Sequence, residues 1–173
     1  TGASNSDNIT RDVTLSLLGV ADPLSVISIF DGGVLLGTVT ASAAGNWSFT
    51  TLALPSGLHN LTASAADGQG NSSGLSPVLA VTVDTTAPAA PTIDLAAASD
   101  TGRSSTDNIT SDTTPTLTGT AEAFATVKVF KSGILSGTVT ADAAGAWSFT
   151  PASVAAGNYS FRASATDAAG NVS

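Results

Sequence analysis

Apolar and polar residues alternate along most of this chain. Residues 126–129 (Thr-Val-Lys-Val) alternate strictly, and residues 159–166 place Tyr, Phe, Ala and Ala on one face and Ser, Arg, Ser and Thr on the other. A period of two is typical of half-buried β-strands. Such stretches recur roughly every ten residues, with Gly, Asp and Asn between them. The alanine-rich stretches keep no long apolar stripe with a helical period, so the pattern predicts an all-β protein.

The chain repeats itself with a period of 100 residues. Residues 1–73 align with residues 101–173 without a gap, and about half of the aligned pairs are identical. Residues 7–10 (Asp-Asn-Ile-Thr), 37–41 (Gly-Thr-Val-Thr-Ala) and 47–50 (Trp-Ser-Phe-Thr) return unchanged one period later. A repeat of this length that holds about seven short strands is typical of a β-sandwich, so two tandem sandwiches are predicted.

Residues 74–100 occur once and set the boundaries of the repeats. They contain a predicted strand at 78–84, a proline-containing linker at 85–91 and a second predicted strand at 92–97. The first repeat therefore spans 1–84 and lacks its opening strand, and the second spans 92–173 and lacks its closing strand. An uncovered strand edge invites pairing with another chain. We expect either that neighbouring chains exchange strands or that the molecule is longer than this sequence. Without strand exchange, the chain is expected to be a monomer.

Several short motifs occur in the order found in a known family. The second repeat has 100–102 (Asp-Thr-Gly), 107–110 (Asp-Asn-Ile-Thr), 114–115 (Thr-Pro), 117–122 (Leu-Thr-Gly-Thr-Ala-Glu), 145–149 (Gly-Ala-Trp-Ser-Phe) and 167–171 (Asp-Ala-Ala-Gly-Asn), and the first repeat ends with 83–88 (Val-Asp-Thr-Thr-Ala-Pro). The chain resembles the tandem bacterial immunoglobulin-like repeats of giant surface adhesins and biofilm-associated proteins. It departs from the pattern at Leu15, where the second repeat has Pro115, and this difference affects the shape of one loop.

The resemblance implies two tandem immunoglobulin-like seven-strand β-sandwiches, each incomplete at one end, in a protein secreted to the cell surface. In that family such repeats are spacers that carry an adhesive tip away from the cell, and calcium often rigidifies the junctions between repeats. They support cell adhesion or biofilm formation. The expected partners are neighbouring copies of the repeat, with a surface or host receptor bound by other parts of the protein. The alternative is a ligand-binding module for a glycan or a host protein.

The charge balance narrows the choice of partners and chemistry. Thirteen acidic residues against five basic ones give a net charge of −8. This argues against nucleic acid, whose binding needs a basic patch. No apolar run is long enough to span a bilayer, and the absence of cysteine excludes thiolate metal sites and cysteine nucleophiles. The acidic residues that could pair for hydrolysis fall in turns without a cleft-forming insertion, so no enzymatic activity is expected.

Acidic residues recur at the repeat period, and the loops of a sandwich alternate between its two poles. Clustered carboxylates repel one another unless a cation neutralises them, and calcium accepts six to eight oxygen ligands. The alternative is that these residues only form Asx-turns. No EF-hand spacing is present. The candidate calcium ligands are Asp7, Asp12, Asp84, Asp100, Asp107, Asp112, Glu122, Asp167 and Asn171.

Four ring-bearing residues are interpreted as structural. His59 is the one histidine of the chain, and a single imidazole without a cysteine partner argues against zinc and against catalysis. A Tyr at the start of the sixth strand is where sandwiches place a tyrosine corner, so Tyr159 is assigned to a corner and His59 to the same place in the first repeat. Trp47 and Trp147 are expected in or beside the core; the alternative is an exposed platform for sugar rings.

Overall fold

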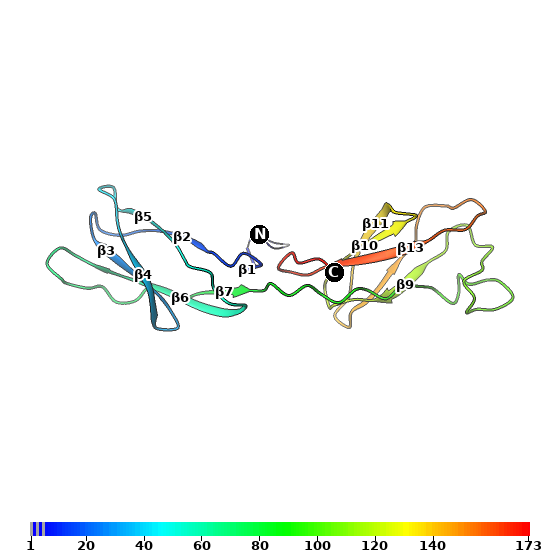
Figure 1. Cartoon of the computed structure of the whole chain (residues 1–173), viewed down its shortest axis with the longest axis horizontal. Coiled ribbons are helices and arrows are strands. Elements are labelled where there is room, and N and C mark those ends of the chain that lie inside the picture. Colours follow the sequence, from blue (N-terminus) through cyan, green and yellow to red (C-terminus); the bar gives the residue numbers. More distant parts are fainter. Residues whose placement is uncertain (1, 3, 5) are drawn as a thin grey trace. The chain divides into compact units, whose positions relative to one another are not determined.

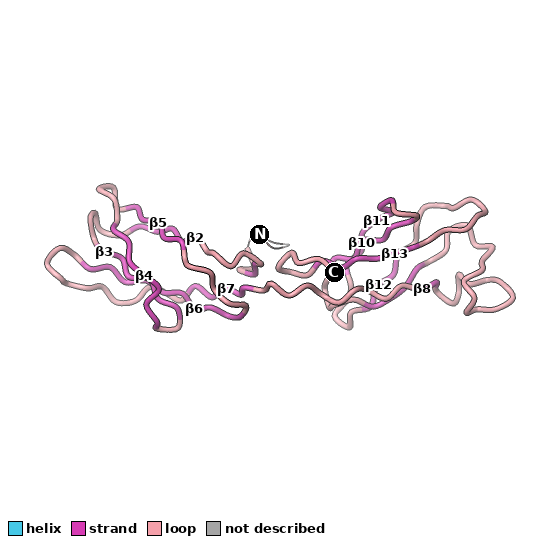
Figure 2. Tube along the Cα trace, in the orientation of Figure 1, coloured by secondary structure: helices cyan, strands magenta, loops and turns pink. Residues whose placement is uncertain are grey.

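The chain divides into two compact units, Thr1–Thr85 and Thr86–Ser173, in a computed structural model that describes residues 2, 4 and 6–173. Every regular element among the described residues is a β-strand (Figures 1 and 2). None of these residues belongs to a helix able to cross a membrane. The all-β prediction is confirmed, because residues that alternate in polarity can bury one face only when they are extended.

Unit 1 is a sandwich of two antiparallel-rich sheets. Its larger sheet has the order β1-β7-β6-β3-β4, and its smaller sheet pairs β2 with β5. Alternate residues of the central strands face inward, so that Ile27, Ile29, Leu61 and Val83 are buried. The strands are β1 (Ile9–Thr10), β2 (Ser16–Val20), β3 (Val26–Asp31), β4 (Val34–Thr40), β5 (Asn46–Thr50), β6 (Gly57–Ala66) and β7 (Leu79–Val83).

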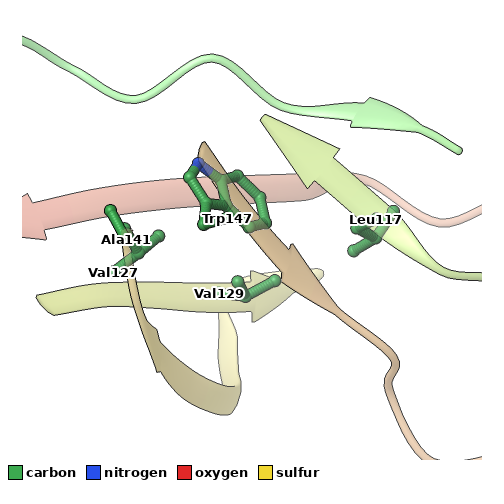
Figure 3. Close-up of a cluster of buried hydrophobic side chains, with 5 residues drawn as sticks. All are labelled: Leu117, Val127, Val129, Ala141 and Trp147. Atoms are coloured by element: carbon green, nitrogen blue, oxygen red, sulfur yellow. The ribbon is translucent and has the colours of Figure 1, made fainter. Parts of the chain in front are cut away.

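Unit 2 packs a sheet of order β11-β10-β13 against a sheet of order β12-β9-β8. The strands are β8 (Asp94–Leu95), β9 (Leu117–Thr120), β10 (Thr126–Lys131), β11 (Ile134–Thr140), β12 (Ala146–Phe149) and β13 (Phe161–Thr166). Trp147, only 4% exposed, lies at the centre of the core, as predicted (Figure 3). It packs with Leu117, Val127, Val129 and Ala141. Trp47, its counterpart in unit 1, is half-buried.

The two units share small details of backbone geometry. The β3–β4 hairpin shifts register between Ile29 and Phe30, and the β10–β11 hairpin shifts at the corresponding place. Gly37 and Gly137 lie against the rings of Phe49 and Phe149, where an added Cβ would overlap the ring. A glycine is needed at this position because the aromatic ring of the opposite sheet approaches the backbone there.

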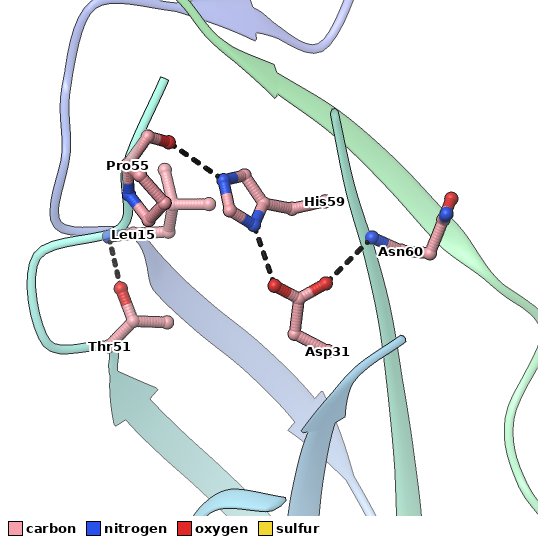
Figure 4. Close-up of polar contacts among 6 residues, drawn as sticks. All are labelled: Leu15, Asp31, Thr51, Pro55, His59 and Asn60. Carbon is pink, nitrogen blue, oxygen red and sulfur yellow. Dashed lines mark hydrogen bonds and ion pairs between the residues drawn. The ribbon is translucent and has the colours of Figure 1, made fainter. Parts of the chain in front are cut away.

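The loop at Leu15 differs between the units through a coupled pair of residues. In unit 1, the Leu15 amide donates to Thr51 Oγ1 at 2.9 Å (Figure 4). In unit 2 the same two positions are Pro115 and Pro151, so both the donor and the acceptor are missing together. A buried polar group without a partner is costly, and removing both partners avoids that cost.

The edges of the two sandwiches differ. In unit 1, β7 lies between β6 and β1. The described part of unit 2 contains no strand at that position, but it has β8 beside β9, and β8 has no counterpart in the described part of unit 1. The two-residue strand β1, which runs parallel to β7, was not predicted because so short an element carries no periodic signal.

Strand β9 begins at Leu117, because Thr114 closes a turn on Asp112 and Pro115 has no amide hydrogen to donate. The strand expected at 92–97 is assigned to Asp94–Leu95 alone. Its ladder extends further, however, because the Thr92 and Ala96 amides donate to the carbonyls of Thr120 and Thr116 at 2.9 and 2.8 Å.

Candidate functional site

The repeated motif at 7–14 and 107–114 forms a pair of side-chain-capped turns in each unit. Asp7 Oδ1 accepts from the Ile9 amide at 3.0 Å, and Asp107 Oδ1 accepts from Ile109 at 3.1 Å. Short polar side chains commonly bond the backbone two residues ahead in this way. In each unit this carboxylate therefore caps a local turn at the start of the motif.

The second acidic residue of the motif is held by a threonine. Asp12 Oδ1 accepts from the Thr14 amide at 3.4 Å, and Asp112 Oδ1 accepts from the Thr114 amide at 2.8 Å. Hydrogen bonds from Thr114, and then from Ser99, favour the charged form and lower the pKa of Asp112. The lowered pKa favours the ionised form of this half-buried carboxylate, which holds its turn.

Asp100 is the unusual carboxylate of unit 2. It is 4% exposed, and its Oδ2 accepts from the Asn108 amide at 3.3 Å. Its Oδ1 is buried and has no hydrogen-bond partner. An unpaired buried carboxylate oxygen is costly, and such atoms mark places where an ion, a water molecule or strain resides. Asn108 follows Asp107 directly in the sequence, so the backbone beside a second acidic residue is tied to Asp100.

Asp167 and Asn171 meet within one turn after β13. Asp167 Oδ1 accepts from the Asn171 amide and Oδ2 accepts from its side-chain amide, both at 2.8 Å. Asp67 and Asn71 repeat the arrangement at 2.8 and 2.7 Å in unit 1, where the Asn71 side chain leads the hydrogen bonds that lower the pKa of Asp67. Both oxygens of each aspartate thus serve the turn.

The two remaining candidates lie at other points of the fold. Asp84 directly follows β7, and its amide donates to the Thr10 carbonyl at 2.8 Å. Glu122 is exposed in the loop between β9 and β10. Among the described residues, no group of three or more His, Asp or Glu side chains is placed to hold a metal ion. The assignment of these residues to calcium stays a prediction.

The corner predicted at the start of the sixth strand is present in both units. The Tyr159 hydroxyl donates to the Ala155 carbonyl at 3.0 Å, and His59 Nε2 lies 2.9 Å from the Pro55 carbonyl, at the equivalent position (Figure 4). The structural role predicted for His59 and Tyr159 is confirmed. Both side chains tie the start of the strand to the loop four residues earlier.

A partner of the corner residue was not predicted. His59 Nδ1 lies 2.6 Å from Asp31 Oδ2, whereas in unit 2 the ammonium of Lys131 lies 5.2 Å from the centre of the Tyr159 ring. The two corner residues therefore differ together between the units. Unit 1 has Asp31 with His59, and unit 2 has Lys131 with Tyr159. Both residues of each pair are visible in the sequence, but no local pattern links positions 28 residues apart.

Comparison with known proteins identifies the family of both units. The family model described as bacterial Ig-like domain matches residues 1–85 and again residues 86–173. The chain belongs to the bacterial Ig-like domain family. It consists of two tandem domains of this family, and such domains are typically structural modules without enzymatic activity. No curated protein matches the chain.

Three solved structures are similar to this bacterial Ig-like chain. The fibronectin(III)-like modules of Clostridium thermocellum CbhA are 21% identical, with a TM-score of 0.47 over 95% of this chain and 82% of that one. A 1.5-MDa bacterial ice-binding adhesin is 22% identical, with a TM-score of 0.44 over 98% and 58%. The BSP domain of a biofilm-associated protein is 17% identical, with a TM-score of 0.36 over 95% and 26%.

Proposed function

We propose that this chain is a pair of spacer repeats from a secreted bacterial surface adhesin, acting in cell adhesion or biofilm formation. The observation that carries the proposal is the way the two repeats differ. Their cores and turns are kept, and two prominent internal differences come as matched pairs. One pair is Leu15 and Thr51 against Pro115 and Pro151, and the other is Asp31 and His59 against Lys131 and Tyr159. Such exchanges preserve the architecture of each unit, which is what a spacer has to supply.

The mechanical role follows from the segment that joins the repeats. Residues 84–93 have no assigned strand and include Pro88 and Pro91. Proline restricts the backbone and makes a short linker semi-rigid. The partners of each repeat are then its neighbouring copies, and contact with a receptor or surface falls to other parts of the protein. The place of action is outside the cell, at its surface.

The alternative of a glycan-binding or host-protein-binding module receives less support. An aromatic platform for a sugar needs an exposed indole face, and Trp147 is buried within its own domain. Trp47 is only half-buried, but it contacts the backbone of β2 at Gly19. Both indoles are therefore used for packing, as expected of residues that hold two sheets together.

We further propose that calcium restrains the junctions between repeats. The fit of the residues rests on Asp100, because its buried and unpaired Oδ1 is the kind of atom that a hard cation would satisfy. Asp100 and Asp107 would contribute one half of such a site. In the first repeat, the corresponding half of a calcium site would come from Asp84, Asp7 and Asp12. Glu122, Asp167 or Asn171 would come from the repeat that follows.

The expected effect of calcium is modest for folding and larger for bending. Extracellular calcium modules bind with dissociation constants of about 10⁻⁴ to 10⁻³ M. At a free concentration ten times the dissociation constant, binding to the native state adds RT ln 11, roughly 1.4 kcal/mol, for each site. That free energy biases a hinge about tenfold. Chelation should therefore loosen the junction before it unfolds either domain.

Small-angle X-ray scattering with calcium and with a chelator tests this proposal on the whole chain. The maximum dimension of the wild type should change on chelation, and that of Asp84→Ala should not. Asp94→Ala removes an exposed aspartate in β8 and serves as the matched control, which should behave like the wild type. Equal dimensions in every sample, together with no calcium heat in calorimetry, would leave these residues as turn formers only.

A further inference from the structure

The loop between β2 and β3 contains a tight turn of residues 22–25 (Asp-Pro-Leu-Ser). The Ser25 amide donates to the Asp22 carbonyl at 3.2 Å, and Leu24 has a φ of 65°. A hydrogen bond from the fourth residue to the first, with proline second and a positive φ at the third, is characteristic of a type II turn. The third position of that turn favours glycine, so a leucine there stores backbone strain.

Unit 2 has the same turn built from different residues. Residues 122–125 are Glu-Ala-Phe-Ala, the Ala125 amide donates to the Glu122 carbonyl at 3.1 Å, and Phe124 has a φ of 62°. The turn and its strain are therefore common to both units. Unit 1 differs by having an aspartate, a proline and a serine at three of the four positions.

The Asp22 carbonyl accepts a second hydrogen bond that Ala125 cannot make in unit 2. Ser25 Oγ donates to this carbonyl at 2.7 Å, and Ser25 is only 3% exposed. The carbonyl oxygen of the peptide bond between Asp22 and Pro23 thus faces two donors, the amide and the hydroxyl of one buried residue. Fixed donors of this kind stabilise the negative charge that an oxygen gains when its carbonyl carbon is attacked.

A nucleophile and a leaving group for such an attack are present in the same two residues. Asp22 is exposed, and its carboxylate reaches its own backbone carbonyl carbon by closing a five-membered ring. A nucleophile tethered to its target avoids the entropic cost of bringing two molecules together. The Pro23 nitrogen carries no hydrogen and leaves as a secondary amine once it is protonated. The Glu122 side chain would have to close a larger ring.

We propose that unit 1 cleaves its own backbone between Asp22 and Pro23. The Asp22 carboxylate oxygen bonds to the Asp22 carbonyl carbon, and the two donors of Ser25 hold the negative carbonyl oxygen. The carbon–nitrogen bond then breaks, and the Pro23 nitrogen leaves with a proton supplied by the solvent. Water opens the resulting cyclic anhydride, which restores the Asp22 side chain and creates a new carboxyl terminus. The net reaction is the hydrolysis of one peptide bond by one water molecule.

The cut changes the covalent chain but does not disperse the domain. The segment before the cut stays bound through β1, which pairs with β7, and through β2, which pairs with β5. The cut also frees Leu24 from its turn, so the strain is released on cleavage. The cleavage happens once in each chain and goes beyond the spacer role. In a spacer, unit 1 would afterwards be held together by strand pairing and packing alone.

The test is intact mass spectrometry of the full chain, denatured after incubation at pH 5 and 37 °C. Mild acid supplies the proton that the Pro23 nitrogen needs. Fragments 1–22 and 23–173 should accumulate, and the bond between residues 122 and 123 should stay intact. The folded chain should cleave at least about tenfold faster than the chain in concentrated guanidinium at the same pH, because the donors of Ser25 are in place only in the fold.

Two variants of unit 1 separate the roles of the residues. Ser25→Ala copies unit 2, keeps the amide donor and should slow cleavage at least about tenfold. Asp22→Glu keeps the charge but enlarges the ring, and should slow cleavage to a similar or greater extent. Trp47 fluorescence checks that unit 1 of each variant remains folded.

Transfer of the site to unit 2 keeps the proposal testable if a unit 1 variant does not fold. The triple substitution Glu122→Asp, Ala123→Pro and Ala125→Ser should create a second cut, between residues 122 and 123. The matched control omits Ala125→Ser and should cut there at least about tenfold more slowly.

Three results would overturn the proposal. The first is cleavage that is as fast in guanidinium as in the folded chain, or as fast in Ser25→Ala, because the fold would then contribute nothing to the reaction. The second is the absence of fragments from the wild-type chain. The third is an intact unit 2 in the triple variant, since the three residues would then not be sufficient for cleavage.

Discussion

The domain of unit 1 should lose stability as the pH rises, through its one histidine. His59 is 6% exposed, and both of its ring nitrogens face acceptors, Asp31 Oδ2 at 2.6 Å and the Pro55 carbonyl at 2.9 Å. A carboxylate and a carbonyl can only accept, so both bonds form only when the imidazole carries two protons. A neutral imidazole has to give up one of them.

The sign of the effect follows from the pKa. The hydrogen bond to Asp31, followed by that to the Pro55 carbonyl, raises the pKa of His59 above its ordinary value of 6.5. A group whose folded pKa is raised contributes its full stabilisation below the unfolded pKa. It loses that stabilisation as the pH rises through the folded pKa. The unit 1 domain should therefore be more stable at pH 5.5 than at pH 9.

The magnitude is set by one hydrogen bond to a charged group. Such bonds contribute roughly 1.5–3 kcal/mol, and the 22% exposure of the Asp31 side chain favours the lower part of that range. For a domain of this size, about 1 kcal/mol shifts the unfolding midpoint by about 4–8 °C. The midpoint of unit 1 should thus fall by roughly 5–12 °C across the titration.

Each unit contains one tryptophan, so Trp47→Phe and Trp147→Phe chains report the unfolding of a single unit by fluorescence. Unit 2 has Tyr159 at the corner and, followed in the Trp47→Phe chain under the same conditions, provides the control. The double substitution Asp31→Lys with His59→Tyr transfers the unit 2 pair to unit 1 and should remove the pH dependence. NMR titration of the His59 ring gives the folded pKa directly.

A flat or rising midpoint of unit 1 between pH 5.5 and 9 would refute this reasoning. So would a His59 titration midpoint at or below 6.5. A fall of equal size in the double-substituted chain would also contradict it, since the effect would then come from other groups.

The remaining predictions concern packing. Gly119→Ala should destabilise unit 2 by roughly 1–3 kcal/mol, because the added methyl would meet the backbone carbonyl of Thr92; Gly19→Ala, where the methyl meets only an indole ring, should cost less in thermal unfolding. Val127→Ala should cost roughly 2–4 kcal/mol in denaturant unfolding, since Val127 is fully buried, and a near-zero change would mean that the core collapses around the gap. Tyr159→Phe removes one hydrogen bond and should cost roughly 0.5–1.5 kcal/mol by the same method.

The roles of individual side chains were predictable where a local pattern carried them. Trp147 two residues before Phe149 on an alternating strand indicated a core residue, and a Tyr at the start of the sixth strand indicated the corner. The pairing of that corner residue with position 31 or 131 was not predictable. Residues such as Asp31 and His59 meet only because β3 and β6 are neighbours in the sheet.

The candidate calcium ligands show the same limit of what a local sequence pattern can predict. Asx-turns at Asp7 and Asp107 could be anticipated, because they join residues two apart. The orphan oxygen of Asp100 could not be anticipated, since its burial depends on how the loop after β8 folds back against residues 108–112. The sequence shows where the carboxylates lie along the chain, but it does not show how exposed their oxygens are to solvent.

The sequence by itself determined that this chain is all-β, that it contains two copies of one sandwich, and where the single linking segment lies. Those properties are encoded in alternation and repetition, which are read along the chain. Only the tertiary structure decided which strands are neighbours in each sheet, that β7 lies between β6 and β1 in unit 1, and that His59 is held between two acceptors. These outcomes depend on hydrogen bonds and burial between residues far apart in the chain, for which a local pattern carries no information.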